Sequence, residues 1–322
     1  MSHQPAQPPR LGPRQPHPLK GIMLKLISVL VFTIMAALLK ATAAEVPAGQ
    51  QVFFRSFFAL PVILAWVIWR GELRVGLRVA DPLSHVWRGV AGSIAMGCSF
   101  AGLGLLPFPE ATALGYAMPL LTVVFAAMFL GERVGWFRLS MVMMGMGGVM
   151  LVLSPRFGVS AETVTVYQTL GAVLTLAGAT FGALAQVFIR KMVDDERTSA
   201  IVFWFSVTAT ILSLATLPFG WVIPDAGTTA VLVLIGLLGG VGQILLTSSY
   251  RFADASVVAP FEYSSMVMAL LIGWFVFGEG MSGLMAFGAA IIMAAGIAII
   301  LRERRLGLER ARARKAAPPR TL

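Results

Sequence analysis

The chain has 322 residues, of which 57% are hydrophobic and 12% charged, and its formal net charge at pH 7 is +10. A soluble domain carries about 25% charged residues because its surface faces water. With about half that share and a mean hydropathy of +0.83, most of this surface must face something other than water. The composition excludes soluble and disordered proteins, and the single cysteine, Cys98, excludes a disulfide-rich secreted one.

Residues 1–19 are rich in Pro and Gln and lack the apolar core and cleavage site of a signal peptide, which predicts a disordered cytoplasmic lead. Residues 303–322 form a basic tail. The positive charge could indicate nucleic acid, but the basic residues lie in short tracts between long apolar runs. That placement is typical of membrane topology, so the expected partner is the lipid bilayer and no nucleic acid.

Between these ends, apolar stretches of about 20 residues recur, and each is long enough to cross roughly 30 Å of hydrocarbon as a helix. Their approximate bounds are 21–43, 50–69, 86–107, 111–130, 136–153, 167–189, 198–218, 229–250, 256–277 and 281–301. The sequence therefore predicts an all-α integral membrane protein with ten transmembrane helices.

Basic residues alternate from one predicted connection to the next. With the N-terminus in the cytoplasm, the cytoplasmic segments hold nearly all of them, Arg88 included, and Arg156 is the one clear basic residue opposite. Four acidic residues mark the opposite segments: Glu45, Glu110, Asp225 and Glu279. Because cytoplasmic loops are enriched in Lys and Arg, both termini are predicted to be cytoplasmic.

The chain repeats weakly within itself. Residues 52–59 resemble residues 202–209, 150 positions on, and Tyr116 recurs as Tyr263, 147 positions on. In the same register, the Gly-Glu pair at 131–132 recurs at 278–279.

Two matches at nearly one offset indicate a five-plus-five duplication, with repeats over 20–155 and 165–302. Since five is odd, the two copies must cross the membrane in opposite directions. Inverted repeats around a central site are typical of alternating-access transporters.

These stretches, in this order, resemble the drug/metabolite transporter superfamily in its ten-helix form with two EamA-type repeats. The likeness covers about residues 20–305 and lies in residues 53–59, 111–119, 131–133, 147–149, 259–264 and 278–279. Pro-Phe-Glu-Tyr at 260–263 resembles the branch for uptake of S-adenosylmethionine, riboflavin and similar metabolites.

The resemblance implies a transporter of a bacterial inner membrane. Four-helix relatives use a glutamate in their first helix for proton coupling, but residues 21–43 contain no acidic residue. That mechanism is not carried over.

Glu262 is the first candidate for a functional residue, because an ionisable group at mid-depth costs about 2.5–3.5 kcal/mol on insertion scales. It is either a substrate ligand or protonatable coupling group, or an interhelical hydrogen bond that fixes packing. Arg55 and Lys40 either anchor an anionic group or extend to the interface. Phe205 replaces Arg55 in the second repeat, and Lys25 is expected to reach the cytoplasmic interface.

Aromatic and amide side chains complete the predicted substrate-binding set. Tyr116 and Tyr263 either stack on a planar substrate and donate a hydrogen bond, or belong to an interfacial aromatic belt. Trp204 either lines the path or faces lipid, and Gln243 either contacts substrate or bridges helices. Pro119 and Pro260 are expected to interrupt their helices near the site, as in transporters with broken helices.

Rival classes lack their motifs. No Asp or His lies inside an apolar run, as an intramembrane protease or metal-dependent enzyme would need, and no Walker-type loop is present. His3, His17 and His85 form no spaced ligand set, so neither a metal nor a cofactor is predicted. A channel would need a charged ring or filter motif.

The predicted function is secondary transport of a small polar organic metabolite across the inner membrane by alternating access. Uptake of a nucleoside-like or vitamin-like compound, of the riboflavin or S-adenosylmethionine type, is favoured. The alternative is an amino-acid or drug/metabolite exporter of the same fold. A coupling proton or ion, and a monomer or a homodimer, stay open as partners.

Overall fold

The computed structural model describes residues 17–79, 81–130, 135–154, 166–192, 196–253 and 259–316. Most of the predicted lead, the Gly-Glu-Arg motif at 131–133 and Arg156 lie outside these ranges. Helices account for the secondary structure of the described residues: α1 (Pro18–Thr42), α2 (Ala48–Phe57), α3 (Ala59–Trp69), α4 (Leu73–Gly76), α5 (Pro82–Leu105), α6 (Phe108–Gly115), α7 (Ala117–Leu130), α8 (Trp136–Leu153), α9 (Val166–Met192), α10 (Thr198–Leu214), α11 (Ala226–Phe252), η3 (Ala259–Tyr263), α13 (Ser264–Phe277) and α14 (Gly283–Ala316).

Each of the ten predicted spans contains helical residues in the described part of the chain. Seven helical segments in the described part of the chain are long and apolar enough to cross a membrane, and Thr198–Leu214 and Phe261–Phe277 are apolar but shorter. The helix α5 is 24 residues long and more polar, and it buries Ser84, His85 and Arg88. A helix surrounded by other helices can carry such residues, because its polar face meets protein rather than lipid.

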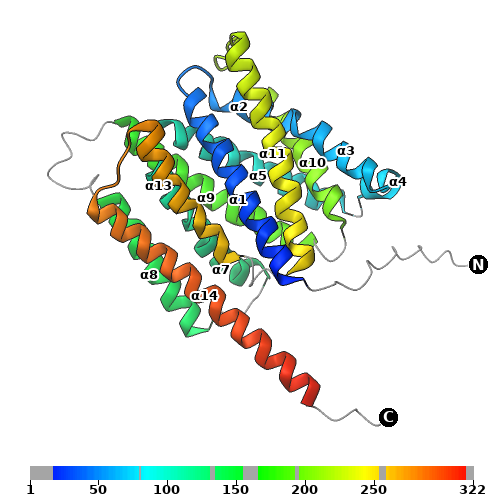
Figure 1. Ribbon diagram of the computed structural model, residues 1–322, viewed down its shortest axis with the longest axis vertical. Helices are drawn as coiled ribbons and strands as arrows, with labels where there is room; N and C mark the ends of the chain where they lie inside the picture. The colour runs from blue at the N-terminus through cyan, green and yellow to red at the C-terminus, as the bar shows by residue number, and fades with distance from the viewer. Residues whose placement is uncertain are drawn as a thin grey trace, which may run out of the picture.

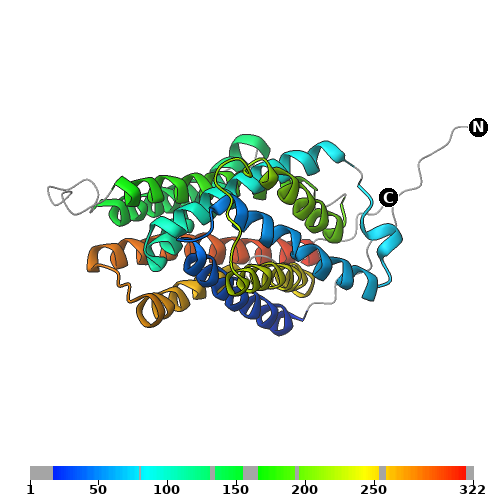
Figure 2. The same cartoon turned by 90° about the horizontal axis from the view of Figure 1, so that it is seen from above.

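The helices pair across the two predicted halves (Figures 1 and 2). The first helix of the first half, α1, packs on α11, and the first helix of the second half, α9, packs on α5. The helices α2 and α10 also pack together, as do α8 and α14. Exchanging the halves therefore reproduces these four pairs, and the core contains residues of both halves, such as Leu39, Phe108 and Ile292.

Two helical segments are broken at tyrosines. A turn at Tyr116 separates α6 from α7, and the 3₁₀ helix η3 passes into α13 at Tyr263. Pro119 lies in the first turn of α7 and Pro260 in η3, where a missing N–H costs little. Glu110, expected in a connection, lies buried in the first turn of α6.

The third helix of each half begins with an aspartate cap. Asp81 accepts hydrogen bonds from the backbone N–H groups of Leu83 and Ser84 at the start of α5. Asp225 accepts them from Gly227 and Thr228 at the start of α11. The side-chain hydrogen bond from Ser84 holds the pKa of Asp81 below its usual value, and that from Thr228 does the same for Asp225.

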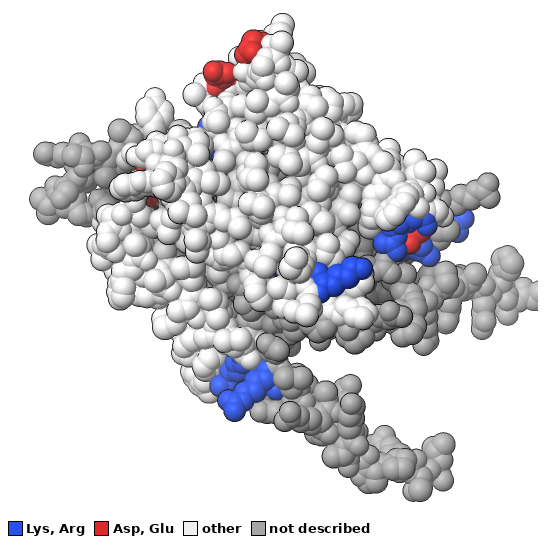
Figure 3. Space-filling model, viewed as in Figure 1, with Lys and Arg blue, Asp and Glu red and all other residues white. Residues whose placement is uncertain are grey.

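Charged side chains gather at the ends of the molecule on the face shown in Figure 3. Acidic residues lie at the end where α11 begins, basic residues lie toward the opposite end, and a mainly basic group that also contains acidic atoms lies beside the α3–α4 region, with a largely uncharged surface between them. A wide uncharged band is what a lipid-facing surface requires.

Candidate functional site

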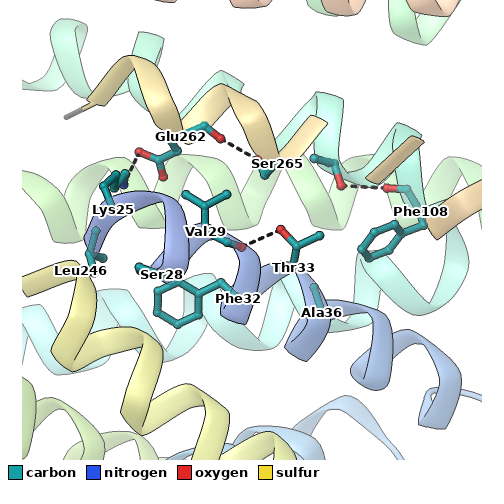
Figure 4. A pocket seen from close by; sticks show the side chains of 11 residues that line it. Lys25, Ser28, Val29, Phe32, Thr33, Ala36, Phe108, Leu246, Glu262 and Ser265 are labelled. Atoms are coloured by element: carbon teal, nitrogen blue, oxygen red, sulfur yellow. Dashed lines mark hydrogen bonds and ion pairs between the residues drawn. The ribbon is translucent and has the colours of Figure 1, made fainter. Parts of the chain in front are cut away.

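A cavity of about 260 Å³ lies between α1, α6, α11 and the η3–α13 segment (Figure 4). One face of α1 forms a wall, since its lining residues recur every three or four positions from Lys25 to Ala36. Other walls come from Phe108 and Thr112 of α6, and from Leu246, Glu262 and Ser265. The lining thus combines both halves of the chain and mixes apolar rings with charged and hydroxyl groups.

An ion pair lines this cavity. The Nζ atom of Lys25 lies 3.2 Å from Oε2 of Glu262. The Lys25 side chain is 2% exposed, whereas that of Glu262 is 44% exposed. The expectation that Lys25 reaches the interface is therefore wrong, because its ammonium is buried against a carboxylate that remains accessible.

The two repeat-related tyrosines meet beside the cavity. The rings of Tyr116 and Tyr263 have centroids 4.9 Å apart and are inclined by 52°. The Tyr116 hydroxyl and the cavity-lining Ser265 hydroxyl are 2.5 Å apart and share a hydrogen bond. Both tyrosines are buried, so their place is inside the bundle rather than in an interfacial belt.

A second ion pair joins α1 to the residue that follows α13. The Nζ atom of Lys40 lies 3.0 Å from Oε1 of Glu279 and donates a hydrogen bond of 2.5 Å to the Leu106 carbonyl. The backbone N–H of Phe108 donates to Oε2 of Glu279 at 2.7 Å. Lys40 and Glu279 are thereby tied to the backbone between α5 and α6, about 22 Å along α1 from Lys25.

The remaining predicted site residues lie outside this cavity. Trp204 is on the surface of α10, where its indole N–H donates to the Leu77 carbonyl at 3.0 Å. Gln243 is half-buried on α11 and is not among the lining residues. Arg55 is buried on α2, where its guanidinium carbon lies 5.7 Å from the centre of the Phe205 ring.

Two functional candidates were missed by sequence reasoning, Lys25 and Arg88. Arg88 was assigned to a cytoplasmic connection, yet it is buried on α5 with its guanidinium carbon 3.6 Å from the centre of the Phe205 ring. Its position inside the predicted span 86–107 could have indicated that Arg88 lies within a helix of the bundle. Among the described residues, no group of three or more His, Cys, Asp or Glu side chains could hold a metal ion.

Comparison with known proteins supplies the context for this site. The model of the EamA-like transporter family matches residues 19–154 and again 169–302. The chain is 31% identical to a riboflavin transporter of Rhizobium johnstonii, over 89% of this chain and 90% of the relative. It is 30% identical to a pseudopaline exporter of Pseudomonas aeruginosa, over 87% of this chain and 95% of the relative.

A third relative is an S-adenosylmethionine uptake transporter of Rickettsia prowazekii, 27% identical over 89% of this chain and 94% of the relative. The resemblance to the branch containing S-adenosylmethionine and riboflavin transporters is confirmed. The two family matches together cover most of the chain, and the relatives are matched over nearly their whole length. These matches assign the chain to a family. The chain belongs to the EamA-like transporter family and is a multi-pass transporter of the inner membrane.

Proposed function

We propose that this transporter moves a small organic metabolite with both a positive and a negative group, by alternating access of two inverted five-helix repeats. The observation that carries the proposal is the Lys25–Glu262 ion pair in the wall of a cavity built from both halves. The proposal includes ten membrane-crossing helices with both termini in the cytoplasm.

The ion pair favours a zwitterionic cargo on energetic grounds. Burying one charge without its partner costs free energy, so the empty carrier is more stable while Lys25 and Glu262 neutralise each other. A cargo with a carboxylate and an ammonium can separate the pair, because its carboxylate then pairs with Lys25 and its ammonium pairs with Glu262. The net charge in the site stays zero throughout, so the exchange avoids the cost of an unpaired charge.

The neighbouring groups favour a cargo with a planar part. The rings of Phe32 and Phe108 line the cavity and give a planar group faces to pack on. The Tyr116–Tyr263 pair lies one hydrogen bond away through Ser265. S-adenosylmethionine, the cargo named for one relative, has a planar base, an amino-acid end with both charges and a sulfonium cation, so its amino-acid end can exchange with the ion pair while one positive charge remains. Riboflavin, named for another relative, is planar but has no such zwitterionic end. The site therefore favours the S-adenosylmethionine type of cargo.

Two features support inverted repeats. Helix neighbours are reproduced when the halves are exchanged, and the repeat-related Tyr116 and Tyr263 touch each other, as residues beside a two-fold axis do. The separation of basic from acidic side chains toward opposite ends supports cytoplasmic termini (Figure 3). A carrier of this kind opens the central cavity to one side at a time by rocking one repeat against the other.

The test is counterflow in proteoliposomes, with labelled S-adenosylmethionine and labelled riboflavin as probes. Wild-type protein is expected to exchange labelled S-adenosylmethionine saturably, with trans-stimulation. Glu262→Gln and Lys25→Met are each expected to lower the exchange rate at least about tenfold at unchanged protein levels. Glu45→Gln is the matched control, because Glu45 is exposed and outside the cavity. Equal exchange by Glu262→Gln and wild type would overturn the proposal.

Export is the second candidate, favoured by the likeness to the pseudopaline exporter. Counterflow does not depend on direction, so the same cavity serves either process. Net flux in cells that carry or lack the gene distinguishes them: uptake predicts faster accumulation of external label, and export predicts faster loss of preloaded label.

A further inference from the structure

Two buried arginines from different helices meet one aromatic ring, and neither arginine lines the cavity described above. Arg55 of α2 and Arg88 of α5 place their guanidinium carbons 5.7 Å and 3.6 Å from the centre of the Phe205 ring of α10. Both side chains are buried. The internal repeat makes Phe205 the counterpart of Arg55, so their contact, like that of the two tyrosines, lies between equivalent positions of the halves.

Donor atoms of both arginines lack partners. The Nε atom of Arg55, and Nε and Nη1 of Arg88, are buried without a hydrogen-bond partner in the described part of the chain. No ion pair between described residues involves either one. The buried Glu196 accepts from the Asp81 N–H and contacts His85 of α5.

This arrangement is costly as it stands. Burial of an unpaired charge is strongly unfavourable, and a desolvated cation–π contact returns only part of that cost. Two guanidinium groups beside one ring also repel each other. A guanidinium does not lose its proton in proteins. The two positive charges therefore need an anion to neutralise them.

The surrounding backbone leaves room for both side chains. A Cβ atom on Gly92 of α5 would lie 2.9 Å from Nη1 of Arg88, and one on Gly239 of α11 would lie 3.1 Å from Nε of Arg55. Glycine at both positions lets each guanidinium lie directly against a helix backbone. Within the described part of the chain, Nε of Arg55 and Nε and Nη1 of Arg88 are therefore held in place by packing.

We propose that Arg55 and Arg88 form a second subsite, which binds an oxyanion of the cargo, a carboxylate or a phosphate group. This proposal rests on the proposed transport function and adds to it a second anionic group of the cargo, beyond the single carboxylate that the S-adenosylmethionine type carries. Arginine suits the task because its planar fork donates two parallel hydrogen bonds to a carboxylate or phosphate. The two helices supply one fork each, so a group with two accepting oxygens satisfies donors from both.

The first test measures stability without any ligand. Arg55→Met combined with Arg88→Met removes two unpaired charges while keeping most of the side-chain volume. We expect the thermal unfolding midpoint of the purified full-length variant to equal or exceed that of wild type, since binding residues are often kept at the expense of stability. A midpoint lowered by more than about 4 °C would assign the arginines a structural role and overturn the proposal.

The second test adds defined probes at equal ionic strength: succinate, inorganic phosphate and the uncharged succinamide. In wild type, succinate or phosphate is expected to raise the midpoint by about 2–4 °C over succinamide. Arg55→Lys with Arg88→Lys should lose most of that shift, because lysine keeps the charge but not the fork. Arg70→Met is the matched control, because Arg70 pairs with Glu72 near the surface, and it should keep the whole shift. A shift from succinate alone assigns a carboxylate, and one from phosphate alone assigns a phosphate.

An equal shift with succinamide, or an anion shift retained by the double lysine variant, would overturn the second subsite. Counterflow measured on the same preparations shows whether the second subsite alone is wrong or whether the proposed transport function is wrong. Exchange that depends on Glu262 without an arginine-dependent anion shift leaves transport standing and removes the subsite. An anion shift without exchange removes the proposed transport and leaves the anion site.

Discussion

The two lysine–glutamate pairs of α1 have the same chemistry in different surroundings. Lys40 and Glu279 also bond to the backbone of Leu106 and Phe108, so four groups hold one another. Glu262 faces a cavity with 44% of its side chain exposed, against 24% for Glu279. From this comparison we expect an ion pair to fix structure when its remaining atoms are bonded to backbone, whereas the proposed exchange for a ligand needs a carboxylate that faces an open space, as Glu262 does.

Removing the lysine of each pair should give the largest difference in stability between the two pairs. Lys40→Met leaves Glu279 partly buried without its cation and the Leu106 carbonyl without its donor, and we expect a loss of about 2–4 kcal/mol. Lys25→Met should lose less, because water in the cavity can solvate Glu262. Thermal unfolding of both purified variants measures the difference. If the two losses are equal, the pairs do not differ in the way described.

Exchanging the lysine and the glutamate within each pair is a second test of the difference between the two pairs. Lys25→Glu with Glu262→Lys restores an ion pair and should remain within about 1 kcal/mol of wild-type stability. Lys40→Glu with Glu279→Lys should stay at least about 2 kcal/mol below it, because a lysine at 279 cannot accept from the Phe108 N–H. The same unfolding assay applies, and full recovery by the second exchange would contradict the role given to the backbone bonds.

The packing around Tyr263, beside the cavity, can be tested by adding a methyl group. A Cβ atom on Gly296 of α14 would overlap the Tyr263 hydroxyl, so Gly296→Ala should destabilise the protein by about 1–2 kcal/mol. Gly97→Ala is the control, because a Cβ there meets nothing within 4 Å, and it should stabilise α5 slightly. Both are read by thermal unfolding, and a neutral Gly296→Ala would show that Tyr263 can move away.

The aspartate caps give the smallest expected effect. The folded pKa values of Asp81 and Asp225 are lowered by hydrogen bonds to the charged forms. Their contribution to stability is therefore present above the unfolded pKa of about 3.9 and is lost as the pH falls through the folded values. Asp81→Asn with Asp225→Asn keeps the caps but removes the charge, so unfolding midpoints should fall less steeply below about pH 4 than in wild type. An unchanged slope would mean that other groups control acid sensitivity.

Much of the architecture was legible in the sequence. A helix needs about 20 apolar residues to cross a bilayer, and that requirement placed all ten predicted spans on stretches where the structure has helices. The family was recognised from short motifs in a specific order. Glu262 stood out because a carboxylate within an apolar run is costly, whatever surrounds it.

The partners of the buried charges were decided by tertiary structure alone. Lys25 and Glu262 are 237 positions apart, and Arg55 and Arg88 come from different helices. In a soluble helix, an apolar stripe shows which side is buried. A transmembrane helix is apolar on the lipid side and on the protein side, so its pattern does not reveal which side faces the bundle. Only packing could turn Lys25, Arg55 and Arg88 inward.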